Sequence, residues 1–270
     1  MPERRPQKQG GSIVFERALE DYDRTRSLPP EAMEAVLGLL TTELTDHQPC
    51  LEIGVGTGRM ALALAGSGVR MAGVDLSLMM LGELRRKAGG KSPFPIACAD
   101  AVHLPFGEAS FGAALAVHVL HLIPAWRDVL AELARVVRRP GVVLVDTGGF
   151  GTGGPGTGWW PVVQERFCKE AGISSGGVGL RKGDDVDGLM ASLGATVRKP
   201  KPIGVNEQTT IAERIEWLEA GVFSFTWQAD EATRRAAAER TRTWAVRRFG
   251  PLDRPVTLSG KVVFRAYDLA

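Results

Sequence analysis

The sequence predicts an α/β fold whose strands form a mostly parallel sheet. Three observations support this prediction. The 270 residues are 44% hydrophobic and 24% charged, which is typical of a globular protein. Short apolar runs alternate with segments of helical period, a pattern typical of right-handed strand–helix–strand units. Glycines at alternate positions follow the first of these runs. The expected strands are Cys50–Ile53, Val69–Val74, Ile96–Ala99, Ala113–Val117 and Val142–Val145.

Helices are predicted before the first strand and between most of the following ones. The clearest of them follows Ser77, an expected N-cap, because a serine side chain accepts a hydrogen bond from the first helical turn. Gly89 and Gly90 are typical of the end of that helix. The expected helices are Glu31–Leu44, Arg59–Ala65, Leu78–Lys87 and Trp126–Val137.

The second half of the chain carries glycine-rich segments and further elements. Glycines are concentrated in residues 147–158 and again in 172–183, and we expect a mobile lid beside the substrate cavity there. Pro200 and Pro202 favour an edge strand over a central one at Thr196–Val205. The other expected elements are helices at Trp159–Ala171 and Asp184–Leu193, a helix from the capping box at Thr210 to Gly221, a helix from Asp230 to Gly250, and a closing strand at Val262–Tyr267.

Charge and cysteine content exclude several classes of partner. Thirty-three basic and 31 acidic side chains leave a net charge of +2, so no overall field directs the protein to nucleic acid or to an anionic membrane. Cys50, Cys98 and Cys168 are too far apart for a zinc knuckle or a disulfide framework. No run reaches the roughly 18 apolar residues of a membrane span, and the N-terminus lacks an apolar signal region. We therefore expect a cytoplasmic protein without nucleic-acid or membrane partners.

The glycines after the first strand predict a ligand site. Glycine lets the backbone come close to a ligand, and the start of the next helix offers free N–H groups. A dinucleotide site requires Gly-x-Gly-x-x-Gly, whereas here Arg59 directly follows Gly58. Glu52, just before the turn, would repel a pyrophosphate but attract an ammonium group. The pattern favours an S-adenosyl ligand over a dinucleotide, and a tight turn without a ligand is the remaining alternative.

Residues Leu51–Arg59 resemble motif I, Glu-x-Gly-x-Gly-Thr-Gly, of the class I S-adenosylmethionine-dependent methyltransferases, in the small-molecule branch of the ubiquinone/menaquinone-biosynthesis type. Val74–Ser77 and Cys98–Ala101 resemble the ends of the family's next two strands. The resemblance covers about residues 13–145. It implies a doubly wound, Rossmann-like, mostly parallel seven-stranded sheet with an antiparallel last strand and a helical insertion before it. Two departures are Gly112, where the family commonly has Asp, and Pro140–Val142, which lacks the usual second glycine.

The resemblance also implies residue roles. The Asp75 carboxylate takes both ribose hydroxyls, and Asp100 accepts the adenine amino group; a turn carboxylate and a solvated strand-end acid are the alternatives. Tyr22 covers the ligand and Arg26 meets its carboxylate, although ordinary surface polarity explains this segment about as well. The implied cofactor-binding residues are Tyr22, Arg26, Glu52, Gly54, Gly56, Gly58, Asp75, Leu76, Asp100, Ala101 and His118.

Two of the four histidines follow the fourth strand. The resemblance implies that His118 lines the cofactor and that His121 faces the active-site cavity, where an ordinary pKa near 6.5 would suit a general base. Packing at the strand end without a catalytic role is the alternative. A metal site is not expected, because no acid or cysteine accompanies them at ligand spacing.

Aromatic and basic residues in the second half have two interpretations each. Trp159, Trp160 and the aromatic residues of 217–227 either roof a cavity for a flat or apolar acceptor or form the core of an added lobe. Six arginines between positions 234 and 248 form a basic helix, and Glu231 and Glu239 among them favour a solvated face over an anionic partner.

The sequence thus predicts an enzyme that transfers a methyl group in line from S-adenosyl-L-methionine to a small-molecule acceptor. Residues 1–30 form an arm over the cofactor, 31–205 and 251–270 the Rossmann-like core, and 206–250 a helical insertion that could close over the substrate. A protein methyltransferase, a non-catalytic S-adenosyl binder and an NAD-type oxidoreductase are the alternatives. No Asn/Asp-Pro-Pro-aromatic motif follows the fourth strand, which disfavours a nucleic-acid methyltransferase.

Overall fold

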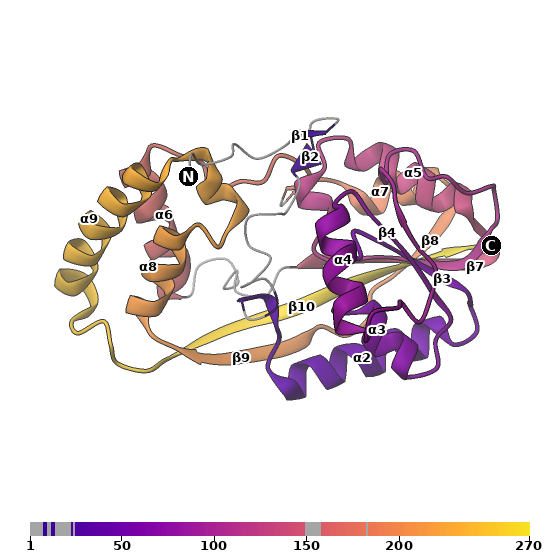
Figure 1. Cartoon of the computed structure of the whole chain (residues 1–270), viewed down its shortest axis with the longest axis horizontal. Helices are drawn as coiled ribbons and strands as arrows, with labels where there is room; N and C mark the ends of the chain where they lie inside the picture. Colours follow the sequence, from indigo (N-terminus) through magenta and orange to yellow (C-terminus); the bar gives the residue numbers. More distant parts are fainter. Residues whose placement is uncertain (1–7, 10–11, 14–22, 24, 149–157, 182) are drawn as a thin grey trace.

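The molecule is built on an eight-stranded sheet, seen edge-on across Figure 1. The computed structural model describes residues 8–9, 12–13, 23, 25–148, 158–181 and 183–270. The strand order is β5-β4-β3-β6-β7-β10-β8, and β9 pairs with the remaining length of β10. The strands are β3 (Cys50–Ile53), β4 (Met71–Asp75), β5 (Ile96–Cys98), β6 (Phe111–Ala116), β7 (Val137–Gly148), β8 (Ala195–Arg198), β9 (Ile203–Thr209) and β10 (Val256–Leu269).

The predicted fold class is confirmed. The strands β3 to β7 run parallel to one another, and β10 is antiparallel to β7, β8 and β9. Two details of the prediction were wrong. The segment Thr196–Val205 is two strands rather than one, because Pro200 and Pro202 interrupt it, and the sheet therefore has eight strands instead of seven. The closing strand is 14 residues long and begins at Val256, because its first half pairs with β9.

Most helices have the predicted limits and caps. Ser77 caps α4 by accepting the Met80 N–H, and Thr210 caps α8 by accepting the Glu213 N–H. Asp230 caps α9 in the same way. The helices are α2 (Pro30–Leu44), α3 (Ala61–Gly66), α4 (Leu78–Lys87), α5 (Trp126–Val136), α6 (Trp159–Ala171), α7 (Val186–Ser192), α8 (Ile211–Ala220) and α9 (Glu231–Phe249), with 3-10 turns η1 (Leu120–Leu122) and η2 (Ser224–Gln228) and a small hairpin of β1 (Lys8–Gln9) and β2 (Ser12–Ile13).

Two apolar layers cover the sheet. One contains buried side chains of α2, α3 and α4, such as Leu40, Leu64 and Leu84. The other contains side chains of α5 and α7, such as Leu133 and Met190. Because helices cover both faces, the central strands are apolar on both sides, as expected for parallel strands. Polar groups are therefore left to the strand ends.

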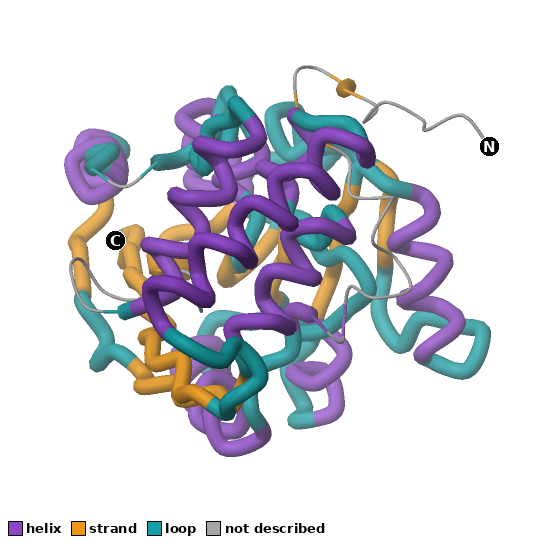
Figure 2. The backbone as a smooth tube through the Cα atoms, turned by 90° about the vertical axis from the view of Figure 1, so that its left-hand side faces the viewer, coloured by secondary structure: helices purple, strands orange, loops and turns teal. Residues whose placement is uncertain are grey.

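The helices α6, α8 and α9 form a separate layer at one end of the molecule, which we call the helical lobe (Figure 1). Figure 2, seen from that side, shows these helices packed together in front of the strands. They share an apolar core that includes Phe167, Ile215 and Ala238. The paired strands β9 and β10 lead from the sheet to this lobe. The helical lobe therefore contains more than the predicted insertion 206–250, because it also includes α6, which precedes β8 in the chain.

Close packing explains the first departure from the family pattern, Gly112, and also why a glycine is needed at Gly141. A Cβ at Gly112 would collide with the His47 carbonyl group, and a Cβ at Gly141 would collide with the Arg138 carbonyl group. The Gly112 N–H also donates to the Pro49 carbonyl at 2.9 Å. The loop before β3 thus lies directly against the start of β6, at the edge of the sheet opposite the candidate site.

Candidate functional site

The turn between β3 and α3 has the form that the glycine pattern predicted. The φ values of Gly54, Gly56 and Gly58 are +61°, +54° and +79°. Residues other than glycine rarely adopt such values. A Cβ at Gly54 would collide with Val119, and one at Gly58 would lie 2.8 Å from Leu84 Cγ. A Cβ at Gly56 would meet only the Gly54 carbonyl oxygen, at 3.8 Å. Gly56 is therefore the glycine of the turn that faces open space.

Glu52 lies behind this turn with an unpaired carboxylate oxygen. Glu52 is 3% exposed, and its Oε2 is buried without a hydrogen-bond partner among the described residues. Burial raises the pKa of Glu52 to about 8, with a smaller contribution from Asp75 in the same direction, while Arg59 and the Ala61 N–H oppose the rise. A buried polar atom without a partner is costly. Glu52 is therefore suited to receive a positively charged hydrogen-bond donor, such as an ammonium group.

Asp75 ends β4 and is held against the glycine turn. Its Oδ2 accepts the Gly56 N–H at 2.8 Å, and its Oδ1 accepts the Ser77 N–H at 2.8 Å. Burial raises the pKa of Asp75, and these N–H groups oppose the rise. Leu76 follows, half-buried, and its carbonyl oxygen lies 3.5 Å from Cys98 Sγ. The structure thus brings Asp75 and Gly56 into direct contact.

Asp100 and Ala101 follow the neighbouring strand β5. Asp100 Oδ1 accepts the Val102 N–H at 3.0 Å, and Ala101 is buried beside it. Because β3, β4 and β5 are parallel neighbours, Glu52, Asp75 and Asp100 lie at the same carboxyl edge of the sheet. That edge is where open α/β sheets bind ligands.

The chain before α2 is fastened to the glycine turn. Thr57 Oγ1 donates to Asp23 Oδ1 at 2.7 Å, and Lys87 Nζ lies 2.8 Å from Asp23 Oδ2. Arg59 Nη1 donates to the Arg26 carbonyl at 2.9 Å. The pairing of Asp23 with Lys87 was not predicted, because these residues are 64 positions apart and carry no local signal of it. Tyr22 lies outside the described residues.

Arg26 connects the turn to the helical lobe. Its Nη2 donates to the Val222 carbonyl at 3.1 Å, and its guanidinium lies 5.2 Å from the centre of the Phe223 ring. Both partners belong to the segment that joins α8 and η2. A contact of Arg26 with the cofactor's carboxylate remains a prediction.

The two histidines after β6 have different surroundings. His118 has a positive φ of 53°, and its Nε2 lies 3.2 Å from Oδ2 of Asp146, near the end of β7. Burial, followed by the charges of Arg59, His121 and Arg26, lowers the pKa of His118 well below 6.5. Asp146 was missed, although an acid directly after the apolar run 142–145 was a visible signal.

The expectation of an ordinary pKa for His121 was wrong. Burial and the nearby Arg26 lower it to about 4, because both disfavour the charged imidazolium. His121 lies in η1, and its carbonyl oxygen accepts the Gly179 N–H at 3.0 Å. The Leu180 N–H bonds to Leu120 in the same way. This part of the predicted lid is therefore tied to the loop after β6.

Aromatic rings gather where the helical lobe meets Arg26. Phe223 stacks on Phe225 with ring centres 5.6 Å apart, and Trp160 lies 5.5 Å from Phe223. Trp159 packs edge-on against Trp160, and its buried indole N–H has no hydrogen-bond partner in the part of the chain that the structure describes. We call Trp159, Trp160, Phe223 and Phe225 the aromatic cluster. The other half of the predicted lid, residues 149–157, lies outside the described residues.

Comparison with known proteins shows what the core is similar to. Residues 51–145 match the model of a family described as a methyltransferase domain. The match covers about a third of the chain, and we use the family's description, methyltransferase domain, for residues 51–145. The matched residues run from β3 to β7 and include the glycine turn, Asp75, Asp100 and His118. The cofactor of such domains is S-adenosyl-L-methionine, and the buried Glu52 oxygen, which has no partner in the described part of the chain, fits its ammonium group.

Relatives of the methyltransferase domain have several names. A malonyl-[acyl-carrier protein] O-methyltransferase of Geobacter sulfurreducens is 30% identical over 141 residues, covering 52% of this chain and 53% of the relative. A demethylmenaquinone methyltransferase of Clavibacter sepedonicus is 31% identical over 137 residues, covering 50% and 56%. The chain thus spans about half the length of these curated relatives. The YcgJ protein from Bacillus subtilis shares the fold, with a TM-score of 0.58 at 18% identity over 88% of this chain and 99% of its own.

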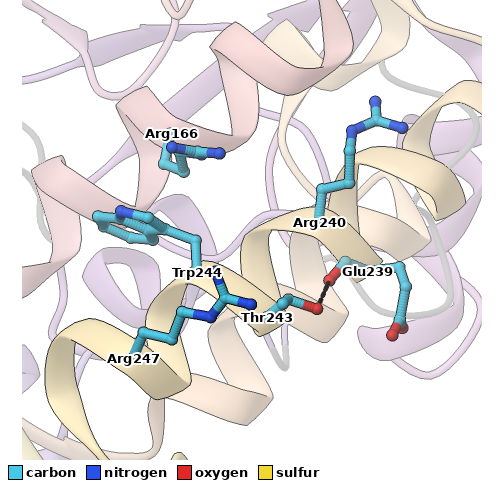
Figure 3. A pocket seen from close by; sticks show the side chains of 6 residues that line it. All are labelled: Arg166, Glu239, Arg240, Thr243, Trp244 and Arg247. Carbon is cyan, nitrogen blue, oxygen red and sulfur yellow. Dashed lines mark hydrogen bonds between the residues drawn. The ribbon is translucent and has the colours of Figure 1, made fainter.

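A pocket of about 410 Å³ lies outside the methyltransferase domain, between α6 and α9 (Figure 3). Arg240 in its wall is already paired with Glu170 at 2.5 Å. The prediction that the arginines of α9 form a solvated face was wrong for Arg234. This side chain is buried and donates to the Glu219 and Ala229 carbonyl groups. The pocket is lined by Arg166, Glu239, Arg240, Thr243, Trp244 and Arg247.

Neither a membrane-spanning helix nor a cluster of metal ligands is present among the described residues. None of the described helices combines the length and the apolar character needed to cross a membrane. The described part of the chain contains no cluster of three or more potential metal ligands from His, Cys, Asp and Glu.

Proposed function

We propose that this protein transfers a methyl group from S-adenosyl-L-methionine to a small-molecule acceptor. The observation that carries the proposal is the buried Glu52 carboxylate oxygen, which has no hydrogen-bond partner among the residues that the structure describes. In the proposed complex Glu52 receives the ammonium group, Asp75 the ribose hydroxyls and Asp100 the adenine amino group. Gly54, Gly56 and Gly58 let the backbone approach the ligand, and Leu76 and Ala101 flank the adenosine.

The cofactor supplies a methyl group bound to a positively charged sulfur. The methyl carbon reacts with a nucleophile that is placed in line with the carbon–sulfur bond. The protein's task is then to hold the acceptor in line and to exclude water. We place the acceptor between the loop after β6 and the aromatic cluster. Arg26 links these two parts through its contacts with Val222 and Phe223.

The aromatic cluster favours a flat or apolar acceptor. Ring faces such as those of Phe223 and Phe225 stack on planar groups, and the unpaired Trp159 N–H offers a donor to a polar atom at the edge of such a group. Relatives named for both demethylmenaquinone and malonyl-[acyl-carrier protein] agree with the methyl transfer, but they differ in the acceptor.

Calorimetric titration with S-adenosylhomocysteine tests the cofactor site. We expect binding by the wild-type protein and a loss of at least about tenfold in Asp75→Ala, because two hydrogen bonds to a charged group are removed. Asp46→Ala, an exposed acid next to α2 at the opposite edge of the sheet, is the matched control and should bind normally. Absence of binding, or equal binding by Asp75→Ala, would refute the proposal. Enhanced fluorescence of NADH on mixing would instead support an oxidoreductase.

A further inference from the structure

The structure pairs His118 with Asp146 at the carboxyl edge of the sheet. His118 follows β6, and Asp146 lies near the end of β7. These two strands are parallel neighbours, with Ala116 of β6 in register with Val145 of β7. His118 Nε2 lies 3.2 Å from Asp146 Oδ2, and the Asp146 side chain is 3% exposed. The His118 side chain remains 23% exposed. A buried acid thus holds a histidine that solvent or a ligand can still reach.

The backbone around His118 places it against the cofactor turn. Its φ of 53° lies in a region that residues other than glycine seldom occupy and that is often found at functional sites. The next residue, Val119, fills the space left by the absent side chain of Gly54. The loop that carries His118 therefore touches the glycine turn directly.

The carboxylate also determines which ring nitrogen is free. A neutral imidazole carries one proton, and the nitrogen that faces a carboxylate keeps it as a donor. Nε2 is the ring nitrogen that lies 3.2 Å from Asp146 Oδ2, so we place the proton on Nε2 and the lone pair on Nδ1. Among the described residues, no group forms a hydrogen bond with Nδ1. By contrast, no carboxylate of the described residues lies within ion-pair distance of His121.

We propose that His118, oriented by Asp146, is the general base that removes the proton of the methyl acceptor, and that this acceptor is a weakly acidic hydroxyl group such as a phenol. This inference rests on the proposed function. The acceptor oxygen forms the new bond to the methyl carbon as the carbon–sulfur bond breaks, and the electron pair of that bond stays on sulfur. The hydroxyl proton passes to Nδ1, the imidazolium is paired with the Asp146 carboxylate, and the proton then leaves to water.

The charges around His118 favour a hydroxyl over other acceptors. Arg59 and Arg26 lie close enough to lower the pKa of His118, and His121 and Asp146 are the other titratable groups that face it. Two guanidinium groups stabilise a developing oxyanion but repel an ammonium group. A carboxylate acceptor has already lost its proton at neutral pH and needs no base.

The first test is the tautomer of His118, which requires no turnover. The chain has four histidines, so ring nitrogens of ¹⁵N-histidine-labelled protein bound to S-adenosylhomocysteine can be assigned with His118→Gln. We expect the Nε2–H tautomer near neutral pH, with its proton shifted strongly downfield by the carboxylate. An Nδ1–H tautomer would overturn the proposal, because it leaves no lone pair for the acceptor. This result decides the proposal whether or not a given probe is turned over.

The second test compares 2-naphthol with 2-naphthoate as methyl acceptors, using S-adenosylmethionine with a labelled methyl group. We expect transfer to the naphthol, a loss in rate of about 100-fold in His118→Gln and a smaller loss in Asp146→Asn. The rate of both variants should recover as the pH approaches about 10, where a phenol ionises by itself. A merely structural role would not produce this recovery.

Binding of S-adenosylhomocysteine separates the two proposals. We expect both variants to bind S-adenosylhomocysteine with a loss in affinity far smaller than the loss in rate, which also shows that they are folded. His47→Gln, at the opposite edge of the sheet, is the control and should keep the full rate. Full activity of His118→Gln, or transfer to naphthoate in preference to naphthol, would overturn the role of His118. Absence of binding by the wild-type protein would refute the proposed function itself.

Discussion

Replacing Glu52 with Gln should stabilise the protein without ligand and weaken the cofactor site. The side chain keeps its shape but can no longer ionise. Glu52 is buried near the end of β3, and its Oε2 has no hydrogen-bond partner from the described residues. The wild-type protein therefore has to bury a charge, or bind a proton, at a position where a neutral amide would be tolerated. Stability and ligand binding are expected to respond in opposite directions.

The size of the effect follows from the pKa of Glu52. Burial raises it from an ordinary 4.5 to about 8. Between these pH values the folded protein binds more protons than the unfolded chain, so the free energy of unfolding falls as the pH rises and levels off above about 8. A difference of about 3.5 between the two pKa values, at about 1.4 kcal/mol for each factor of ten, corresponds to about 5 kcal/mol.

Urea unfolding near pH 5 and near pH 9 measures this difference. Relative to wild type, Glu52→Gln should gain little near pH 5 and about 5 kcal/mol near pH 9, with an unchanged slope in urea. Glu34→Gln, an exposed position on α2, is the control and should change stability by about 0.5 kcal/mol or less at both values. Calorimetry with S-adenosylhomocysteine should show weaker binding by Glu52→Gln.

Equal effects of Glu52→Gln at the two pH values would refute this reasoning. They would mean that Glu52 ionises as readily in the folded protein as in the unfolded chain. A variant that binds S-adenosylhomocysteine as tightly as wild type would refute the assignment of Glu52 to the ammonium group, although the stability argument would stand.

Three further predictions concern the turn, the arm and the second histidine. Gly54→Ala should destabilise the protein by about 1–3 kcal/mol in urea unfolding, because the added Cβ collides with the loop after β6 at a positive φ, whereas Gly82→Ala in the open middle of α4 should not destabilise it. Thr57→Val removes the 2.7 Å hydrogen bond to Asp23 and should make the chain before α2 more sensitive to limited proteolysis; unchanged cleavage would count against this fastening. His121 has its pKa lowered to about 4, so the unfolded chain binds more protons between about pH 4 and 6.5, and stability falls as the pH falls through that window; His121→Gln should reduce this acid loss, measured as the shift of the urea midpoint.

Local signals were enough to predict the elements around the cofactor turn. The limits of β3 and α4 agree with the prediction at both ends, because an apolar run, a serine cap and paired glycines act within a few residues. The glycine turn and Asp75 were found in the same way. Their contact depends on the neighbouring positions of β3 and β4, which strand–helix–strand connections make predictable.

What could not be predicted depends on contacts between distant parts of the chain. The first half of β10 is a strand because β9 pairs with it, and nothing within Val256–Val262 shows this. The lowered pKa of His121 results from burial and from Arg26, which is 95 positions away in the chain, so the ordinary value was the wrong expectation. The proximity of Asp146 to His118 depends on the pairing of β7 with β6, which the sequence around Asp146 does not show.

Three unfavourable features of the described structure belong to the candidate site and to the aromatic cluster beside it. Glu52 has a buried oxygen without a partner, His118 has a positive φ, and the Trp159 N–H is buried and unpaired. A domain of ordinary composition should remove such features unless a ligand compensates them. One of these features lies in β3, one in the loop after β6 and one at the start of α6, although these elements are far apart in sequence. This convergence is expected if a single ligand complex, of cofactor and acceptor together, supplies the missing partners.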